Sequence, residues 1–305
     1  MAPYKSWAKE PNKTMISKFI PYHYAKHPTA YEGMNLSDRT GIVTGANSGI
    51  GYEAAKKLLG LGLSHIVLGV RTLVKGKVAA EKLRSVAPDA KIDVWPLDMT
   101  SYKSIQAFVE RCDTELKHID FVILNAGGGT NSFEIVKETG HESIMQTNFY
   151  GPVFLTVLML PVLRGRSSTE TPPKITYISS FGETLAQLPY GVASSYLSQF
   201  DDPEAMPWAA DNRYYVSKLF STIFLSRLAE EISSEHVIIN MIELCFVKGG
   251  NSAENLRGML RYGLKTAWFL FGRTLEDAAR IYVDAVIVKG RESHGCALAY
   301  GEIVA

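Results

Sequence analysis

The chain has 305 residues, of which 46% are hydrophobic and 21% are charged, a balance typical of a folded globular protein that excludes disordered and fibrous classes. Its 32 Lys and Arg residues nearly balance 31 Asp and Glu residues, which gives a formal net charge of +1. Without a basic excess, the chain lacks the electrostatic signature of a nucleic-acid-binding protein.

The cysteines and the N-terminal segment predict the compartment. Cys112, Cys245 and Cys296 are far apart and odd in number, which favours free thiols in a reducing compartment and offers no spacing for a zinc site. Residues 1–28 scatter lysines and prolines through what would have to be the apolar part of a secretory signal. We therefore expect a cytoplasmic protein without a metal site.

Short β-branched runs alternate with longer segments of helical period from about residue 40 onward. This is the pattern of βαβ units, so we predict a single-domain α/β protein with a parallel sheet. Several of the runs are apolar almost throughout, as expected for strands that helices cover on both faces. The seven predicted strands are Gly41–Thr44, His65–Val70, Lys91–Pro96, Asp120–Leu124, Lys174–Ser179, Val237–Ile242 and Ala297–Tyr300.

Some of the intervening helices have recognisable features. Ser101 precedes a helical segment that runs to Lys117, and Thr274 with Asp277 resembles a capping box that opens LEDAARIYVDAV. The charge-free stretch Phe149–Leu163 contains two prolines and is shorter than the roughly 20 residues that span a bilayer. We interpret it as a buried helix and predict no membrane span.

Three stretches fall outside this alternation. Residues 1–37 form a polar and aromatic arm, 181–212 a long connection with several acids, and 249–272 a segment rich in aromatic and large apolar side chains. Connections longer than about 15 residues are usually functional lids or disordered. For the insert 181–212 we expect a partly ordered flank of the active site, with a mobile solvated segment as the alternative. The predicted domain spans residues 38–305.

A glycine-rich turn, TGANSGIG at Thr44–Gly51, follows the first predicted strand and opens a predicted helix. Glycines allow the backbone to approach a pyrophosphate, whose charge then lies over the free N–H groups of the helix. Gly45, Gly49 and Gly51 depart from the more familiar spacing of dinucleotide-binding turns. A tight turn without a ligand is the alternative, but the position at the start of a βαβ repeat favours dinucleotide binding.

Arg71 follows the second predicted strand, in VLGVRT. In dinucleotide-binding folds an acid at this place bonds the adenosine ribose, whereas an arginine accommodates a 2′-phosphate. The planar guanidinium suits a phosphate. A solvated arginine at a strand end is the alternative. The sequence therefore favours NADP over NAD as the cofactor.

Tyr214 and Lys218 stand four residues apart in a segment of helical period, so they lie on one helix face, one turn apart. A free tyrosine has a pKa of about 10, and a neighbouring ammonium lowers it. Such a pair can act as a general acid/base. A tyrosine and a lysine at this spacing also occur by chance as a surface pair, so the motif gains its meaning from the others.

Together these motifs resemble the short-chain dehydrogenase/reductase family. The resemblance also includes PLDMTS with Asp98, LNAG at 124–127, QTNFYG with Asn148 and ITYISS ending at Ser180, all in family order over about residues 38–300. The N-terminal arm and KGKVAAEKL resemble the branch found in fungal natural-product pathways. The resemblance implies a Rossmann-type, doubly wound parallel sheet of about seven strands that binds NAD(P).

The resemblance also implies four catalytic residues. Tyr214 would exchange a proton with the substrate oxygen, and Ser180 would hydrogen-bond that oxygen. Lys218 would hold the nicotinamide ribose and lower the pKa of Tyr214, while Asn148 would support a water-linked proton path. The implied cofactor-binding residues are Gly45, Asn47, Ser48, Gly49, Ile50, Gly51, Arg71, Asp98 beside the adenine, Met99, Asn125, Ala126, Gly127, Tyr214, Lys218 and Val247.

For Ser179, Tyr215 and Asn47, packing or turn formation is an interpretation at least as good as direct catalysis. Two departures from the family pattern stand out. The separation of Ser180 and Tyr214 is larger than is usual, so the insert must loop out beside the active site. After the sixth strand the family typically has Pro-Gly and a threonine, whereas this chain has ELCFVKG at 243–249, which puts bulkier residues beside the nicotinamide position.

We therefore predict an NADPH-dependent reductase of a ketone or aldehyde on an apolar small molecule. The apolar segment Gly258–Gly272, at the family's substrate-loop position, suggests the apolar substrate, although a core or subunit contact explains it equally well. The helices at 149–163 and after Tyr214 are where family members pair, so we expect a homo-oligomer. The alternatives are an enzyme of this fold that catalyses a non-redox step and a binding or scaffold protein with a vestigial site.

Overall fold

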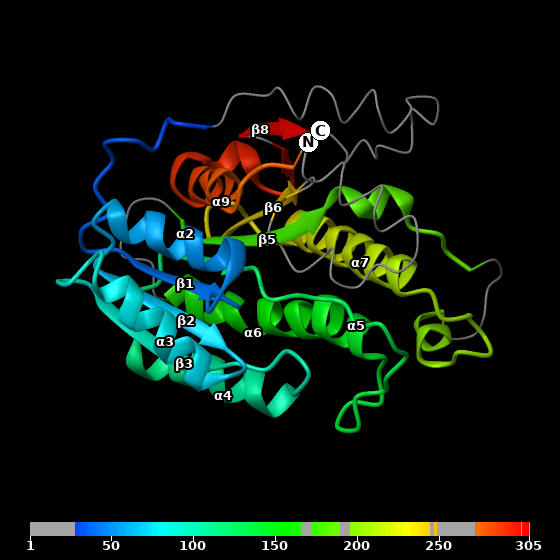
Figure 1. Ribbon diagram of the computed structural model, residues 1–305. Helices are drawn as coiled ribbons and strands as arrows, with labels where there is room; N and C mark the ends of the chain where they lie inside the picture. Colours follow the sequence, from blue (N-terminus) through cyan, green and yellow to red (C-terminus); the bar gives the residue numbers. More distant parts are fainter. Residues whose placement is uncertain are drawn as a thin grey trace.

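Helices cover both faces of a mostly parallel sheet in the computed structural model (Figure 1). The structure describes residues 28–165, 172–189, 196–244, 247–248, 272–299 and 301–304. Within these ranges eight strands form one sheet in the order β3-β2-β1-β4-β5-β6-β7-β8. They are β1 (Thr40–Thr44), β2 (His65–Val70), β3 (Lys91–Pro96), β4 (Phe121–Leu124), β5 (Lys174–Ser180), β6 (Ile238–Leu244), β7 (Ala297–Ala299) and β8 (Glu302–Val304).

The strand order confirms the predicted doubly wound α/β fold. The first seven strands agree with the predicted runs to within two residues, and β1 to β7 pair in parallel. The eighth strand was not predicted. It pairs antiparallel with β7, and it has only three residues, too few for an alternation to be recognised in the sequence.

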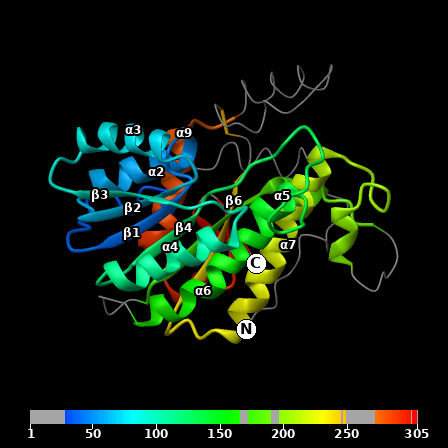
Figure 2. The same ribbon diagram turned by 90° about the horizontal axis from the view of Figure 1, so that it is seen from below.

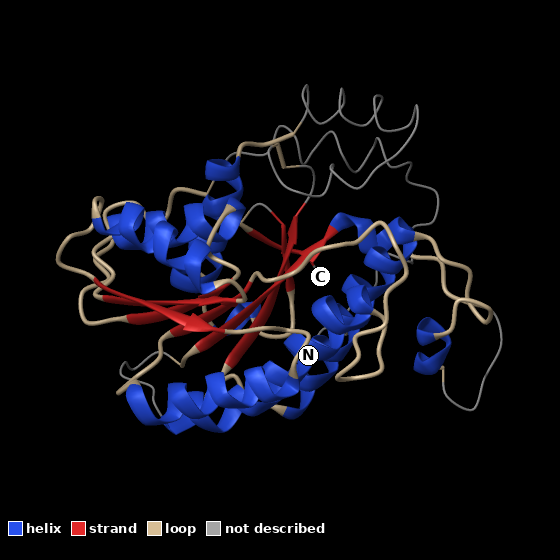
Figure 3. Ribbon diagram, turned by 60° about the horizontal axis from the view of Figure 1, so that its bottom comes forward, coloured by secondary structure: helices blue, strands red, loops and turns tan. Residues whose placement is uncertain are grey.

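Two layers of helices enclose the sheet (Figures 2 and 3). One layer consists of α2, α3 and α9, and the other of α4, α6 and α7. Ser101 and Thr274 cap α4 and α9 by accepting hydrogen bonds from the amides of Ser104 and Asp277, as predicted. The bounds of the longer helices are α2 (Gly49–Gly60), α3 (Leu73–Arg84), α4 (Tyr102–Glu115), α6 (Gly151–Gly165), α7 (Ala210–Glu231) and α9 (Leu275–Val283).

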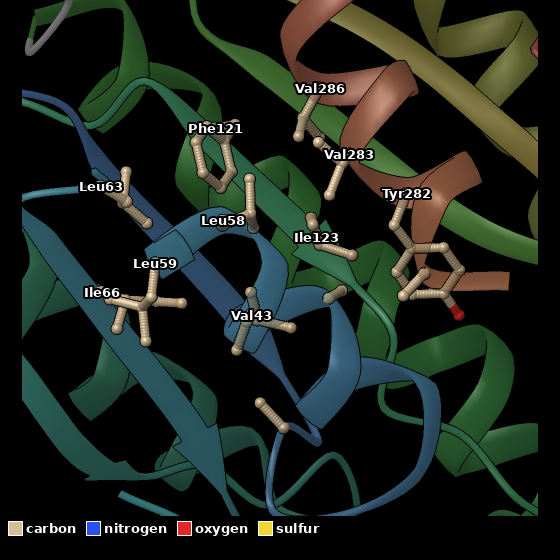
Figure 4. Close-up of a cluster of buried hydrophobic side chains, with 14 of the residues drawn as sticks. Val43, Leu58, Leu59, Leu63, Ile66, Phe121, Ile123, Tyr282, Val283 and Val286 are labelled. Atoms are coloured by element: carbon tan, nitrogen blue, oxygen red, sulfur yellow. The ribbon is translucent and has the colours of Figure 1, made fainter. Parts of the chain in front are cut away.

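Alternate strand residues supply the two halves of the core. Val43 and Ile123 face α2 and α9, where Leu58 and Val283 meet them (Figure 4). Their neighbours Ile42 and Val122 belong to the opposite half, against α4, α6 and α7. Because both faces of the central strands are buried, these strands are apolar almost throughout.

The helix before β5 is longer than predicted. The short helix α5 (Ser143–Met145), a π-helical turn η2 (Gln146–Tyr150) and α6 follow one another without a break. In the described part of the chain, 143–165 is the one helical stretch long and apolar enough to cross a membrane by length and composition. Leu155 and Met159 of this stretch are buried against the sheet and the neighbouring helices. Packing inside the fold therefore accounts for its apolar composition.

Residues 28–37, the last part of the predicted N-terminal arm, pack against the domain. Tyr31 and Leu36 are buried in the same cluster as α2 and α9, and Glu32 forms an ion pair with Arg280 of α9 at 2.9 Å. The earlier part of the arm lies outside the described residues.

The described part of the insert 181–212 is more firmly packed than predicted. Phe200 is fully buried beside Met145, Phe149 and Val216. Asp201, one of the acids of the insert, pairs with His141 at 2.9 Å and accepts the amide of Glu142 at 2.7 Å.

The buried Arg213 fixes this packing. Its guanidinium donates to the carbonyl of Phe200 and lies 5.1 Å from the centre of that ring. These two contacts of the buried guanidinium, with a backbone carbonyl and with an aromatic face, hold the segment against α7. The segment around Phe200 is therefore part of the core.

Replacing Phe200 by alanine tests this assignment. Removal of a fully buried ring should lower the free energy of unfolding by about 3 to 5 kcal/mol, measured by chemical denaturation. Leu197→Ala, a change at a partly exposed position of the same segment, should cost only about 0.5 kcal/mol. Equal small effects for both variants would show that the segment is not part of the core.

Candidate active site

Most of the predicted site residues lie near the carboxyl ends of β1, β4 and β5. The chain winds from β1 outward to β3, then returns across β1 to β4 and winds in the other direction. Ligands of doubly wound sheets bind outside the strand ends at this switch point. The loops after β1 and β4 flank it here, and the ends of β5 and α7 lie beside them.

The turn after β1 contains two glycines in the left-handed region of the backbone. Gly45 and Gly49 have φ of +69° and +62°, a region that side chains rarely tolerate. A Cβ on Gly49 would meet no atom within 4 Å, so this glycine borders open space. Ser48 makes no side-chain cap to α2, and the first turn of α2 holds no acid. The helix N-terminus can therefore receive an anion.

The glycine turn is joined to the end of β4 by close contacts. A Cβ on Gly51 would lie 2.5 Å from Nδ2 of Asn125, so only glycine allows this approach. That amide nitrogen donates to the carbonyl of Thr44 at 2.9 Å, and the hydroxyl of Thr44 accepts the amide of Ala126 at 2.8 Å. The LNAG motif therefore fixes the shape of the loop before α2.

Tyr282 of α9 supports the same junction. Its ring is buried in the apolar cluster and its hydroxyl points away from that cluster (Figure 4). The hydroxyl donates to Oδ1 of Asn125 at 3.0 Å. Sequence analysis missed both Thr44 and Tyr282 as supporting residues. The glycine motif contained Thr44, but nothing in the sequence pointed from α9 to the strand ends.

The residues expected at the adenosine end lie on the side of β2 and β3. Arg71 is exposed directly after β2. Oδ1 of Asp98 accepts the amide and the hydroxyl of Thr100, at 2.9 and 2.7 Å, so this carboxylate shapes its own turn. Met99 is buried in the core, and its carbonyl accepts the side chain of Gln146 at 3.0 Å.

Asn148 is the centre of a buried hydrogen-bond network. Its side-chain amide bonds both the amide and the carbonyl of Gly128 at 2.9 Å and donates to Ser217 of α7 at 3.0 Å. Its own carbonyl accepts the hydroxyls of Tyr177 at 3.0 Å and Ser221 at 2.8 Å. The π-helical turn around Asn148, a feature often found at functional sites, thus ties the loop after β4, strand β5 and helix α7 together.

Tyr214 lies beside Ser180, where β5 ends. A hydrogen bond with Ser180 lowers the pKa of Tyr214, but burial outweighs it and raises the pKa to about 12. Sequence analysis expected a lowered pKa from the neighbouring ammonium, so this expectation is wrong for the protein without cofactor. The desolvation of the phenolate is larger than any favourable charge effect, and the hydroxyl therefore keeps its proton at neutral pH.

Lys218 is buried one helical turn after Tyr214. Its Nζ donates to the carbonyl of Ile178 at 2.8 Å and lies 5.8 Å from the centre of the Tyr214 ring. A Cβ on Gly127 would lie 3.4 Å from this nitrogen, so the lysine reaches the loop after β4. Burial lowers the pKa of Lys218 to about 8.

A buried carboxyl that sequence analysis missed lies nearby. Glu183, in the 3₁₀ turn η3 (Phe181–Leu185), accepts hydrogen bonds from Ser179 and Thr222, the latter at 2.8 Å. Burial raises its pKa to about 7. Ser179 thus belongs to this cluster, while the ring of Tyr215 lies against Gly182, a packing role.

Comparisons with known proteins bear on this site. The short chain dehydrogenase model matches residues 39–196. A short chain dehydrogenase/reductase of Annulohypoxylon moriforme is 42% identical over 261 residues, 86% of this chain and 75% of that protein. A short chain dehydrogenase of Penicillium oxalicum is 36% identical over 306 residues, 94% of each chain. This chain belongs to the short-chain dehydrogenase/reductase family.

The fold is similar to that of solved structures. A short-chain dehydrogenase from Sphingobium yanoikuyae in complex with NADPH is 17% identical, with a TM-score of 0.57 over 80% of this chain and 83% of that one. The two sequence relatives come from fungi, in agreement with the fungal branch that the motifs resemble. The coarse activity of the family, oxidation or reduction, follows from this membership.

Some of the predicted site residues of this short-chain dehydrogenase/reductase are not part of the group formed by Ser180, Tyr214 and Lys218. Nδ2 of Asn47 lies 3.5 Å from Oγ of its neighbour Ser48. Ile50 packs against the core. Val247 forms a β-bridge with Arg273. Cys245 and most of the segment 249–272 lie outside the described residues, so the altered turn after β6 stays a prediction. The described residues hold no group of three side chains suited to a metal.

Proposed function

We propose that this protein is an NADP-preferring reductase that converts a ketone or aldehyde on an apolar small molecule to an alcohol, in a fungal natural-product pathway. The observation that carries this proposal is the arrangement of Tyr214 beside Ser180, with Lys218 buried one turn behind, at the sheet's switch point. It is the combination of a proton donor, an oxygen-binding hydroxyl and a cation that carbonyl reduction needs.

The residues at the strand ends fit a dinucleotide. The open space beside Gly49 and the uncapped N-terminus of α2 suit a pyrophosphate. Lys218, next to Gly127, is the group that would hold the nicotinamide ribose, and Asn125–Gly127 would line the cleft. When bound, NADPH supplies the hydride that reduces the carbonyl carbon.

The protein's own part in the reaction is to bind the carbonyl oxygen and to deliver a proton to it. Ser180 and Tyr214 hydrogen-bond the oxygen, and Tyr214 donates its proton as negative charge develops there. Because burial raises the pKa of Tyr214 to about 12, the hydroxyl is protonated over the physiological range, as a proton donor must be. The reduction requires Tyr214 in this protonated form.

Asn148 acts as a positioning residue in this proposal. Its bonds to Gly128 and Ser217 fix the distance between the loop after β4 and helix α7, and hence between the cofactor cleft and Tyr214. The water-linked proton path expected of Asn148 stays a prediction. In the structure, the backbone carbonyl of Asn148 accepts hydrogen bonds from the hydroxyls of Tyr177 and Ser221.

The cofactor preference rests on Arg71. Solved structures of this fold hold NADPH in one case and NAD in another, so the fold alone does not choose. Arg71 is exposed at the end of β2, where a guanidinium can pair with a 2′-phosphate.

An apolar surface supports the proposed homo-oligomer. Val157 of α6 and Ile223 of α7 are 43% and 44% exposed. A hollow of about 540 Å³ beside them is lined by Tyr102, Gln106, Tyr150, Val153, Phe154, Val157 and Phe224. Apolar surface gathered on two neighbouring helices is typical of a protein interface.

Tyr214→Phe tests the proton donor. The variant keeps the ring, so the fold should be retained while turnover falls about 10²- to 10⁴-fold. The assay follows the loss of NADPH absorbance with a panel of ketones and aldehydes. Tyr215→Phe, which removes the neighbouring hydroxyl, is the matched control and should keep most of the turnover. Undiminished turnover in Tyr214→Phe would require another proton donor.

Arg71→Asp tests the cofactor preference. Wild-type protein should bind NADPH at least about tenfold more tightly than NADH, because the guanidinium pairs with the additional phosphate. The variant should lose or invert this ratio in a fluorescence titration of each cofactor. Arg227→Asp makes the same charge change on an exposed part of α7 and should leave the ratio intact. Equal wild-type affinity for NADPH and NADH would contradict the assignment.

A further inference from the structure

Glu183 is a buried acid that the proposed reaction does not use. The residue is 7% exposed. Oε2 of its carboxyl group accepts hydrogen bonds from the hydroxyls of Ser179 on β5 and Thr222 on α7. The two hydroxyls also lie 2.9 Å from each other. A carboxyl held by two buried hydroxyls has a fixed position, and in its ionised form it needs a charge partner.

The position of Thr222 shows what this carboxyl faces. Tyr214, Lys218 and Thr222 follow one another at four-residue spacing in α7, so they form one stripe along a single helix face. Glu183 bonds the end of this stripe next to Lys218, and Lys218 is the charged group that acts on it. Lys218 itself bonds the carbonyl of Ile178, the residue before Ser179, so both hydroxyls that hold Glu183 belong to close neighbours of the lysine. The acid and the buried ammonium therefore lie in one buried cluster behind the proton donor.

The groups packed around Glu183 from other elements offer little competing charge. Tyr177 of β5 is fully buried, and burial raises its pKa well above 10, so it is neutral. Tyr214 of α7 is neutral as well, because its pKa is raised to about 12. Glu243 of β6 is a second buried acid, in register with Ser179, and has its own interactions. Lys218 is thus the cation that faces Glu183 among these groups.

We propose that Glu183 is a positioning residue that supplies the counter-charge of Lys218 and keeps its ammonium protonated at the pH at which the enzyme works. The proposal rests on the proposed function in one respect: the ammonium matters because it holds the cofactor ribose. Glu183 does not touch substrate in this account. It acts through Lys218.

The two titrations have a defined order. Burial raises the pKa of Glu183 to about 7, so its charge is present above that pH, while burial lowers the pKa of Lys218 to about 8. The negative charge of Glu183 opposes the lowering of the Lys218 pKa. Without this charge, Lys218 loses its proton at a lower pH, and the upper limit of the range in which it binds the ribose moves down.

The experiment measures the titration of Lys218 directly. Wild-type protein and Glu183→Gln are prepared with carbon-13-labelled lysine, and the Cε chemical shift is followed by NMR from pH 6 to 10, with Lys218→Arg for assignment. The amide keeps the size of the acid and removes its charge. The midpoint of Lys218 should fall by about one pH unit in the variant. Glu204→Gln removes a charge from the exposed part of the insert and should leave the midpoint unchanged.

A second readout is the pH dependence of NADPH binding. The ratio of Kd between Glu183→Gln and wild type should be close to one at pH 6 and about fivefold at pH 8, as expected for a one-unit shift of the lysine. A merely structural role would weaken binding by the same factor at every pH. If Glu183→Gln does not fold, Thr222→Val serves instead. It removes one hydrogen bond to the carboxylate and should lower the Lys218 midpoint by a smaller amount.

The outcomes separate this inference from the proposed function. A lowered Lys218 midpoint supports the inference even if no carbonyl compound is reduced, because the NMR titration needs neither substrate nor cofactor. An unchanged midpoint in a folded Glu183→Gln variant overturns it, even if wild-type protein reduces carbonyl compounds with NADPH.

Discussion

The buried hydrogen bonds of Asn148 are the constraint on which the active-site geometry depends. They join three elements that are far apart in the sequence: the loop after β4, strand β5 and helix α7. The π-helical turn places a backbone carbonyl where two hydroxyls can reach it. Because these groups are buried, breaking one bond would leave an unsatisfied polar atom, which is costly. The network therefore holds α7 at a fixed distance from the cofactor cleft.

The electrostatics of the site follow from burial more than from pairing. Burial raises the pKa of Tyr214 and lowers that of Lys218, so it favours the neutral form of each side chain. For a proton donor, a neutral tyrosine is the useful state, so desolvation serves reduction. For the lysine, desolvation works against ribose binding, because the cation is the useful state. The negative charge of Glu183, in the same buried cluster, opposes this shift, which gives the acid a physical reason to be present.

Much of the fold and the site could be predicted from the sequence. The β-branched runs gave the first seven strands, because strands buried on both faces are apolar. The glycine turn and the LNAG motif each follow a strand, and the spacing of Tyr214 and Lys218 places both side chains on one helix face. These motifs therefore predicted which residues meet at the strand ends. Residues that act across elements were missed. Tyr282 and Glu183 reach the site from α9 and η3, and no local pattern announces such contacts.

The insert shows the same limit. We expected a partly ordered flank of the active site there, whereas the burial of Phe200 and the contact of Arg213 with its carbonyl are tertiary features that no local pattern predicts. The lowered pKa expected for Tyr214 was wrong for a related reason. Residue spacing indicates that an ammonium is near, whereas the pKa depends on how much water surrounds the phenol. Spacing predicts neighbours, and only the packed structure gives their environment.

The central claim is that the protein transfers hydride from NADPH to a carbonyl carbon. The most direct measurement uses NADPH that carries deuterium at its transferable position and detects the label in the alcohol product by mass spectrometry. The account predicts one deuterium per product molecule and no product without NADPH. Conversion of substrate at an undiminished rate without NADPH, with no label in the product, would contradict it and identify a non-redox enzyme of the same fold.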